Sequence, residues 1–117
     1  MKNILLAICL ALTLVSCSEE EKEVVLLQER DNLMFEPRQK IPFTGKNVMR
    51  WESGQKKLER TYKDGKLDGI EIRWYENGQK KLEKSYKDGK ADGAEIRWYS
   101  NGEKKWETTY KDDKIVQ

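Results

Sequence analysis

A repeat of 24 residues constrains the fold of this chain more than any other feature of its sequence. Residues 46–69 and 70–93 are identical at 14 of 24 positions, and residues 70–93 and 94–117 are again identical at 14 of 24. Self-similarity at a fixed period of this length is typical of chains built from stacked copies of one small unit. We therefore expect three equivalent units, 46–69, 70–93 and 94–117, each packed mainly against its neighbours.

Each unit contains two turn signals, separated by short alternating segments. One signal is Asn-Gly (Ser-Gly in the first unit) and the other is Asp-Gly, and both favour tight hairpins because their residues accept positive φ. The turn glycines are Gly54, Gly78 and Gly102 in the first signal and Gly65 and Gly89 in the second, with Asp112-Asp113 replacing the last Asp-Gly. The segments between the turns carry β-branched and aromatic residues. These features predict an all-β fold, a single-layer antiparallel meander of hairpins, in which the last unit stops pairing near its end.

A register follows if both kinds of loop contain three residues. Ile72 then lies opposite Leu82, and Leu82 lies opposite Ala94. This register predicts one apolar and one charged face. The apolar face would hold Val48, Leu58, Tyr62, Ile72, Trp74, Leu82, Tyr86, Ala94, Ile96, Trp98, Trp106 and Tyr110. The charged face would hold Glu71, Arg73, Lys81, Glu83, Glu95, Arg97 and Lys105, with Trp51, Tyr75 and Tyr99 as an isolated aromatic row.

Residues 24–45, which precede the repeats, are predicted to form an N-terminal capping segment. Apolar residues at 24–27 and 33–35 flank Arg30-Asp31-Asn32, a pattern that indicates a hairpin or two short strands. Pro37 and Pro42 then interrupt pairing, because proline lacks a backbone donor. The first unit of a repeat array needs such a cap to cover its open side.

The first 16 residues have the pattern of a secretion signal. After a positive start at Lys2, residues 4–15 form an uncharged run that suits a signal peptide and is too short to span a membrane. The run ends in Leu14-Val15-Ser16-Cys17, which resembles the bacterial lipobox. The resemblance implies that Cys17 is lipidated, with palmitate among its acyl chains, and becomes the mature N-terminus.

The segment 17–23 is acidic and is predicted to be a solvated tether. Ser18 after the cysteine is similar to the sorting signal for the outer membrane. The glutamates that follow resemble the surface-export signals of some lipoproteins. We therefore expect a lipid-anchored protein of the bacterial cell envelope, at the outer membrane and open to surface exposure.

The composition excludes several classes of protein. Histidine is absent, which removes the commonest general base and metal ligand, and lipidation of Cys17 would leave the mature chain without a thiol. Lys and Arg number 23 against 21 Asp and Glu, and the signs are interspersed, so no basic stripe indicates nucleic acid. We expect no enzymatic activity, no cofactor or metal, no small-molecule substrate and no nucleic-acid partner.

Residues 74–93, with the sequence WYENGQKKLEKSYKDGKADG, resemble the variant MORN repeat. The shared pattern is an aromatic pair, Asn-Gly, a basic stretch and Tyr-Lys-Asp-Gly-Lys-x-Asp-Gly, and the resemblance extends over residues 42–114. Such repeats define the YwqK-type proteins, often described as antitoxin components of toxin–antitoxin systems. The resemblance implies an elongated, slightly curved sheet of hairpins that contacts a partner or a membrane, with a toxin-like or envelope protein as the partner.

The candidate binding residues are aromatic and lysine positions that recur with the repeat. They are Trp51, Trp74, Tyr75, Trp98, Tyr99, Lys80 and Lys81. A purely structural interpretation makes Trp74 and Trp98 part of the core and the lysines a solvated sheet edge. A functional interpretation makes an exposed aromatic patch a binding surface. We predict a membrane-anchored, non-catalytic protein-binding module that acts like an antitoxin. The alternatives are a carbohydrate-binding envelope lipoprotein that uses the aromatic row, and an envelope spacer without a specific ligand.

Overall fold

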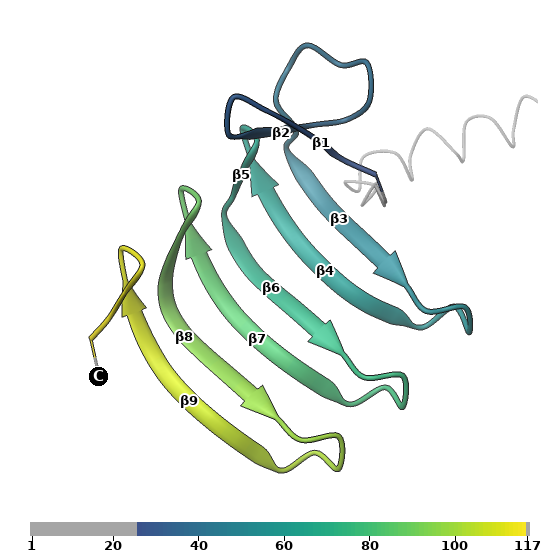
Figure 1. Ribbon diagram of the computed structural model, residues 1–117, viewed down its shortest axis with the longest axis vertical. Coiled ribbons are helices and arrows are strands. Elements are labelled where there is room, and N and C mark those ends of the chain that lie inside the picture. The colour runs from purple at the N-terminus through teal and green to yellow at the C-terminus, as the bar shows by residue number, and fades with distance from the viewer. Residues whose placement is uncertain (1–25, 117) are drawn as a thin grey trace, which may run out of the picture.

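The computed structural model describes residues 26–116 as one open antiparallel β-sheet with a separate hairpin at one end (Figure 1). The strands are β1 (Gln28–Arg30), β2 (Leu33–Phe35), β3 (Gly45–Arg50), β4 (Lys56–Lys63), β5 (Lys66–Leu67), β6 (Gly69–Trp74), β7 (Lys80–Lys87), β8 (Lys90–Trp98), β9 (Lys104–Lys111) and β10 (Lys114–Ile115). The sheet order is β10-β9-β8-β7-β6-β4-β3, and β5 pairs with the end of β4. Neighbouring strands in the sheet are neighbours in the chain, so the predicted all-β meander is confirmed.

The predicted signal peptide, Cys17, the predicted tether and the first two residues of the predicted capping segment lie outside the described residues. Within residues 26–116 there is no helix at all, and hence none long and apolar enough to cross a membrane.

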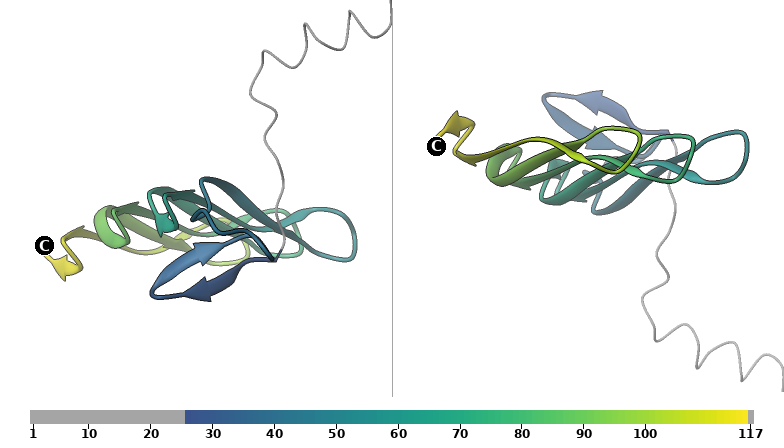
Figure 2. Two further views of the ribbon diagram at one scale, coloured as in Figure 1. Left: turned by 90° about the horizontal axis from the view of Figure 1, so that it is seen from above. Right: turned by 90° about the horizontal axis from the view of Figure 1, so that it is seen from below.

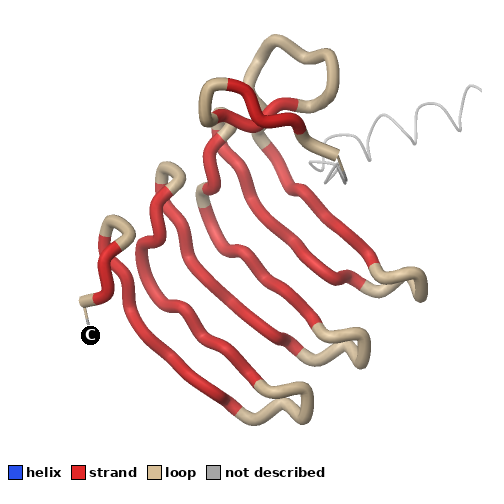
Figure 3. Tube along the Cα trace, viewed as in Figure 1, coloured by secondary structure: helices blue, strands red, loops and turns tan. Residues whose placement is uncertain are grey.

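The Asn-Gly loops lie along one end of the sheet and the Asp-Gly turns along the opposite end (Figure 3). In the middle unit, Tyr75 donates its N–H to the carbonyl of Gln79 at 2.9 Å, and Gly78 donates to the carbonyl of Tyr75 at 3.0 Å. These two bonds enclose a loop of three residues, 76–78. Gly78, the last of them, has a φ of 87°, in the left-handed region that favours glycine. Asn77 supports the loop because its Oδ1 accepts the N–H of Gln79. The three-residue loop predicted here is confirmed.

The Asp-Gly turns enclose two residues, so the three-residue loop predicted for them is wrong. Lys87 pairs directly with Lys90, and both residues between them have positive φ, 49° at Asp88 and 82° at Gly89. This is the twisted two-residue turn that suits antiparallel hairpins. The last unit keeps the same turn at Asp112-Asp113, because aspartate tolerates the left-handed region. Pairing therefore continues into β10, contrary to the expected loss of pairing.

A β-bulge near the Asn-Gly loop of each unit changes the predicted register. Arg73 pairs with Leu82 and Trp74 pairs with Lys80, so Lys81 is an extra residue on β7. Ile72 consequently lies opposite Glu83, and the predicted pairing of Ile72 with Leu82 is wrong. Equivalent shifts occur between β3 and β4 and between β8 and β9.

This register gives two mixed faces, so the predicted division into an apolar and a charged face is also wrong. We call one the tyrosine face; across the strands it carries Met49, Leu58, Arg60, Tyr62, Glu71, Arg73, Leu82, Lys84, Tyr86, Glu95, Arg97, Trp106, Thr108 and Tyr110. We call the other the isoleucine face; it carries Val48, Glu59, Ile72, Trp74, Glu83, Ile96, Trp98 and Glu107. Apolar and charged residues alternate across the strands on both faces. The reason is that each one-residue shift in pairing moves the side chains of one strand to the opposite face of the sheet.

The N-terminal hairpin predicted around Asp31-Asn32 is confirmed as β1 and β2, which pair with each other and stand off one side of the sheet (Figure 2). It covers the tyrosine face at the first unit. The centre of this contact is Phe43 against Tyr62, with ring centroids 5.9 Å apart. Leu27, Met34 and Leu67 pack around these two rings. The compact apolar core therefore lies under the cap, and the rest of the sheet is held by pairing and by side-chain contacts across its strands.

Backbone hydrogen bonds link each turn to the unit before it. The second residue of each Asp-Gly turn donates its N–H to a carbonyl 22 positions earlier: Gly65 to Phe43 at 2.8 Å, Gly89 to Leu67 at 2.7 Å and Asp113 to Ala91 at 2.9 Å. These bonds fix the orientation of successive units, so side chains at equivalent positions recur at regular spacing along the sheet.

Candidate binding surface

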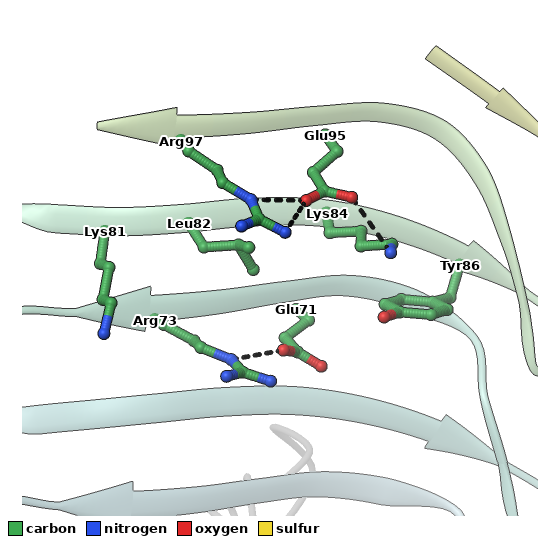
Figure 4. A pocket seen from close by; sticks show the side chains of 8 residues that line it. All are labelled: Glu71, Arg73, Lys81, Leu82, Lys84, Tyr86, Glu95 and Arg97. Carbon is green, nitrogen blue, oxygen red and sulfur yellow. Dashed lines mark hydrogen bonds and ion pairs between the residues drawn. The ribbon is translucent and has the colours of Figure 1, made fainter. Parts of the chain in front are cut away.

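Two carboxylates are buried at the centre of the tyrosine face, and each is bound by two cations. Figure 4 shows both cations of Glu95 and one of the two cations of Glu71, Arg73. Glu71 is 3% exposed; its Oε2 lies 2.9 Å from Arg60 Nε and its Oε1 lies 2.7 Å from Arg73 Nε. Arg60 comes from β4, whereas Arg73 is two residues along β6 from the glutamate. A buried carboxylate without such partners would be strongly destabilising.

Glu95 repeats this arrangement on β8 and is fully buried, with 0% exposure. Its Oε1 accepts from Arg97 Nε and lies 2.7 Å from Arg97 Nη2, while its Oε2 lies 3.0 Å from Lys84 Nζ on β7. The contact with Lys84 is an ion pair rather than an aligned hydrogen bond, since Oε2 has no hydrogen-bond partner by angle. Each of the two buried carboxylates is therefore held by one cation from its own unit and one from the unit before it.

The charges in this ladder shift one another's protonation. Burial by itself would raise the pKa of Glu95, but the two cations at its carboxylate, Lys84 and then Arg97, outweigh this effect, and the pKa is lowered. Burial likewise opposes the charged form of Lys84, yet Glu95 raises its pKa. The pKa of Tyr86 is raised, first by burial and then by the charge of Glu71. The shifts at Glu95 and Lys84 thus favour the charged forms of both groups, and the shift at Tyr86 favours its neutral form.

The ion ladder ends in neutral residues at both edges of the sheet. Asn47 on β3 stands where the later units have Glu71 and Glu95, and Thr108 on β9 stands where the earlier units have Arg60 and Lys84. The charged residues are present only where a neighbouring strand supplies the opposite charge.

A row of cations over aromatic rings borders the ladder on the same face. Lys57 Nζ lies 4.6 Å from the Trp51 ring centroid, and Lys81 Nζ lies 5.6 Å from the Tyr75 ring centroid. In the last unit Lys105 Nζ lies 5.6 Å from the ring centroid of Tyr99. These distances are within the range of cation–π attraction. Within residues 26–116 none of the three lysines pairs with a carboxylate.

The bulge separates the two lysines of each Lys-Lys pair. Lys81 lies with Leu82 on the tyrosine face, as Figure 4 shows, whereas Lys80 lies on the isoleucine face and binds Glu83 at 2.9 Å. Lys56 and Lys104 make the same bond with the glutamates of their own units. The predicted candidates Lys80 and Lys81 thus belong to different surfaces.

Tyr75, predicted to be part of an isolated aromatic row, instead joins two units. Its Oη donates to the carbonyl of Trp98 at 2.8 Å, and nearby Asn77 Nδ2 donates to the carbonyl of Ser100 at 2.7 Å. Tyr99 is the equivalent residue of the last unit; it is 48% exposed, with no later unit in the described part of the chain. Trp98 is half-buried on the isoleucine face.

The tyrosine face is hollowed in three places. One hollow, of about 220 Å³, is lined by Glu71, Arg73, Lys81, Leu82, Lys84, Tyr86, Glu95 and Arg97. A second, of about 180 Å³, is lined by Met49, Trp51, Lys57, Leu58, Arg60, Arg73, Trp74 and Lys81. A third, of about 300 Å³, lies against the N-terminal hairpin, and its lining includes Met34, Tyr62 and Tyr86. The first two are smaller than the sites of about 300–1,000 Å³ that enclose drug-sized ligands, and the third reaches only the lower end of that range. No cluster of three metal-ligating side chains occurs within residues 26–116. The surface suits contact with an extended molecule.

Sequence reasoning missed the buried glutamates and the roles of Arg60 and Arg73. It placed Glu71 and Glu95 on an open charged face, whereas the structure buries both beside cations from neighbouring strands. The repeat does contain one signal of these ion pairs. The first unit has Asn47 where the later units have a glutamate, and the last unit has Thr108 where the earlier units have a cation, so each charge is replaced where its partner strand is absent from the repeat.

Comparison with known families agrees with this architecture. A family described as a MORN repeat variant matches residues 67–88, which extend from the end of β5 through β7 to the following turn. This supports a MORN-repeat protein, and the repeat is of a non-catalytic binding type. The chain matches none of the curated proteins and none of the solved structures.

Proposed function

We propose that this chain is a non-catalytic protein-binding module that holds its partner on the tyrosine face. The observation that carries the proposal is the recurrence of one cation–aromatic pair, Lys57 with Trp51, Lys81 with Tyr75 and Lys105 with Tyr99, on a rigid sheet. Trp, Tyr and Arg are the side chains that most often dominate the energy of protein interfaces, and the exposed side chains of Arg73 and Arg97 lie on the same face as these aromatic rings. Units fixed by backbone bonds present these groups with little conformational entropy left to lose on binding.

The geometry favours a protein over a carbohydrate. Stacking on a sugar needs an open ring face, but lysines lie over the rings of Tyr75 and Tyr99. Tyr75 is further held by its bond to Trp98. An acidic protein surface can instead engage the lysines and arginines directly, without displacing them from the rings.

The specific form of this function that we propose is antitoxin-like neutralisation of a partner by a lipid-anchored protein. The support is the resemblance of the repeats to YwqK-type proteins and the lipobox-like sequence before Cys17. A module of this kind acts by covering the partner's surface, and it needs no catalytic group.

The test is affinity capture of partners from envelope extracts by the tagged full chain. A charge-reversed variant, Lys81→Glu/Lys105→Glu, should lose the captured partner, whereas the matched variant Lys80→Glu/Lys104→Glu should retain it. The partner should arrest growth when expressed alone, and co-expression of the chain should restore growth. Retention of purified envelope glycan, with no protein captured by the wild type, would refute the proposal.

The lipid anchor has a separate test. Cys17→Ala should abolish incorporation of labelled palmitate and release the protein from the membrane fraction, because each acyl chain contributes about 0.8 kcal/mol per buried CH₂ group. The matched variant Cys9→Ala, inside the signal segment, should be labelled normally. Undiminished labelling of Cys17→Ala would exclude this anchor.

A further inference from the structure

We infer that the tyrosine face is built to accept an acidic segment in the polyproline II conformation, laid across the strands. The inference rests on the proposed function and specifies the chemistry of the partner. Three observations carry it: the excess of cations, their spacing, and the shape that the cap gives to the face.

The excess of cations defines the charge of the partner. Each buried glutamate already holds two cations, yet the arginines keep donors free: the side chain of Arg73 is 46% exposed and that of Arg97 is 53% exposed. Lys57, Lys81 and Lys105 add three charges without a carboxylate in the described part of the chain. The excess is smaller on the isoleucine face, where each lysine binds a glutamate of its own unit and Glu59 binds both Lys46 and Lys56. Acidic groups are therefore attracted more strongly to the tyrosine face.

The spacing defines the conformation of the partner. Equivalent residues of successive units are two strands apart, which is about 9.6 Å at about 4.8 Å per strand. A polyproline II helix rises about 3.1 Å per residue with three residues per turn, so every third side chain points the same way at intervals of about 9.3 Å. In a β-strand, by contrast, residues three apart point to opposite sides. Glutamate at every third position of a polyproline II segment therefore meets one cation of each unit.

The aromatic row fits the remaining positions of such a segment. Proline-rich segments bind in grooves lined by aromatic side chains. Trp51, Tyr75 and Tyr99 recur with the same two-strand period as the lysines beside them. Prolines between the glutamates can pack on these rings and on Leu82, which lies between Arg73 and Arg97 in the row across the sheet.

The cap favours a peptide over a membrane as the anionic partner. The β1–β2 hairpin stands off the tyrosine face beside Tyr62, as the two views of Figure 2 show. A flat bilayer would meet the hairpin before it reached the lysines. A single extended segment passes between the hairpin and the Asn-Gly loops.

The test is calorimetric titration of the full chain with a synthetic peptide of repeated Glu-Pro-Pro units. Three comparisons define specificity: repeated Lys-Pro-Pro, a peptide of identical composition with its glutamates grouped at one end, and vesicles of phosphatidylserine and phosphatidylcholine. We expect the periodic acidic peptide to bind about tenfold more tightly than the grouped one, a difference of about 1.4 kcal/mol. The lysine peptide should not bind, and the chain should bind the vesicles no more tightly than vesicles of phosphatidylcholine alone, into which the proposed lipid on Cys17 would insert equally well.

Two matched triple variants locate the site. Lys57→Gln/Lys81→Gln/Lys105→Gln should weaken binding of the periodic peptide at least about tenfold. Lys56→Gln/Lys80→Gln/Lys104→Gln removes the same charge from adjacent positions on the other face and should leave affinity within about threefold. Equal loss in both variants, equal affinity for the grouped peptide, or tighter binding of vesicles when they contain phosphatidylserine would overturn the inference. The two proposals can fail separately. If the periodic peptide does not bind, but the Lys81→Glu/Lys105→Glu variant still loses the captured protein, this inference is wrong and the proposed function stands.

Discussion

Replacement of Glu95 by Gln tests the ion ladder that organises the tyrosine face. Glu95 is fully buried between Lys84 and Arg97, and the amide keeps the shape of the side chain but removes its charge. Two cations then face a neutral group, and the amide N–H₂ turns a donor toward one of them. The change removes the charge that compensates both cations.

The expected cost follows from burial. Breaking a buried ion pair by removing one partner costs about 3–5 kcal/mol. Solvation by water offsets part of this cost for Arg97, whose side chain is 53% exposed. It offsets less for Lys84, whose side chain is 21% exposed. We therefore expect a loss of about 2–3 kcal/mol in the free energy of unfolding, which lowers Tm by roughly 10–20 °C in a domain of this size.

Glu83→Gln is the matched control. Glu83 lies on the neighbouring strand and the opposite face, it is 29% exposed, and it has one exposed partner, Lys80. An exposed pair contributes about 0–1 kcal/mol, so this variant should be nearly as stable as the wild type. Urea unfolding followed by tryptophan fluorescence measures both variants. Equal losses in the two variants, or a loss below about 1 kcal/mol for Glu95→Gln, would refute the reasoning.

The same substitution changes the response to acid. Because the folded state lowers the pKa of Glu95 below its ordinary value of 4.5, the ionised group stabilises the protein fully above that pH. This stabilisation is lost as the pH falls below 4.5 and through the lowered pKa of the folded state. Wild-type stability should therefore decline on acidification in that window, and the decline should be shallower in Glu95→Gln. If stability declined equally steeply with falling pH in both proteins, the pKa of Glu95 would not be lowered by folding.

Two further pairs of substitutions test the contacts between units. Tyr75→Phe should cost about 1 kcal/mol, because it removes the hydrogen bond to Trp98, whereas Tyr99→Phe should cost less than about 0.5 kcal/mol in the same urea titration; equal effects would argue against the inter-unit bond. Gly65 and Gly89 share a φ of 82°, so alanine strains both by about 1–2 kcal/mol, but at Gly65 the added Cβ would also approach the N-terminal hairpin to 2.9 Å. Gly65→Ala should therefore be clearly the less stable of the two by thermal unfolding, and equal Tm values would contradict the placement of the cap.

Much of the fold could be predicted because glycine and asparagine determine turns locally. The three-residue loop at Gly78 and the hairpin at Asp31-Asn32 depend only on residues that accept positive φ. The meander follows from repeating such turns every 24 residues.

The register could not be predicted, because the bulge leaves no hydrophobic signal. Lys80 and Lys81 are alike in sequence, and nothing in the pair shows that the second is the extra residue. Maximising one apolar face then chose the wrong loop at Gly89. It also placed Glu71 and Glu95 in solvent, because glutamate is rarely buried unless it is paired with a cation. Those partners come from other strands, so only the correct register reveals them.

The most direct test of the central claim, that the partner binds the tyrosine face, is site-specific photo-crosslinking in cells. A photoreactive amino acid is placed in the full chain at Lys81 or at Lys80, which are adjacent in sequence, exposed, and on opposite faces of β7. Our account predicts a discrete adduct with a partner protein from position 81 and none from position 80. Adducts from position 80 alone, or equally from both positions, would contradict it.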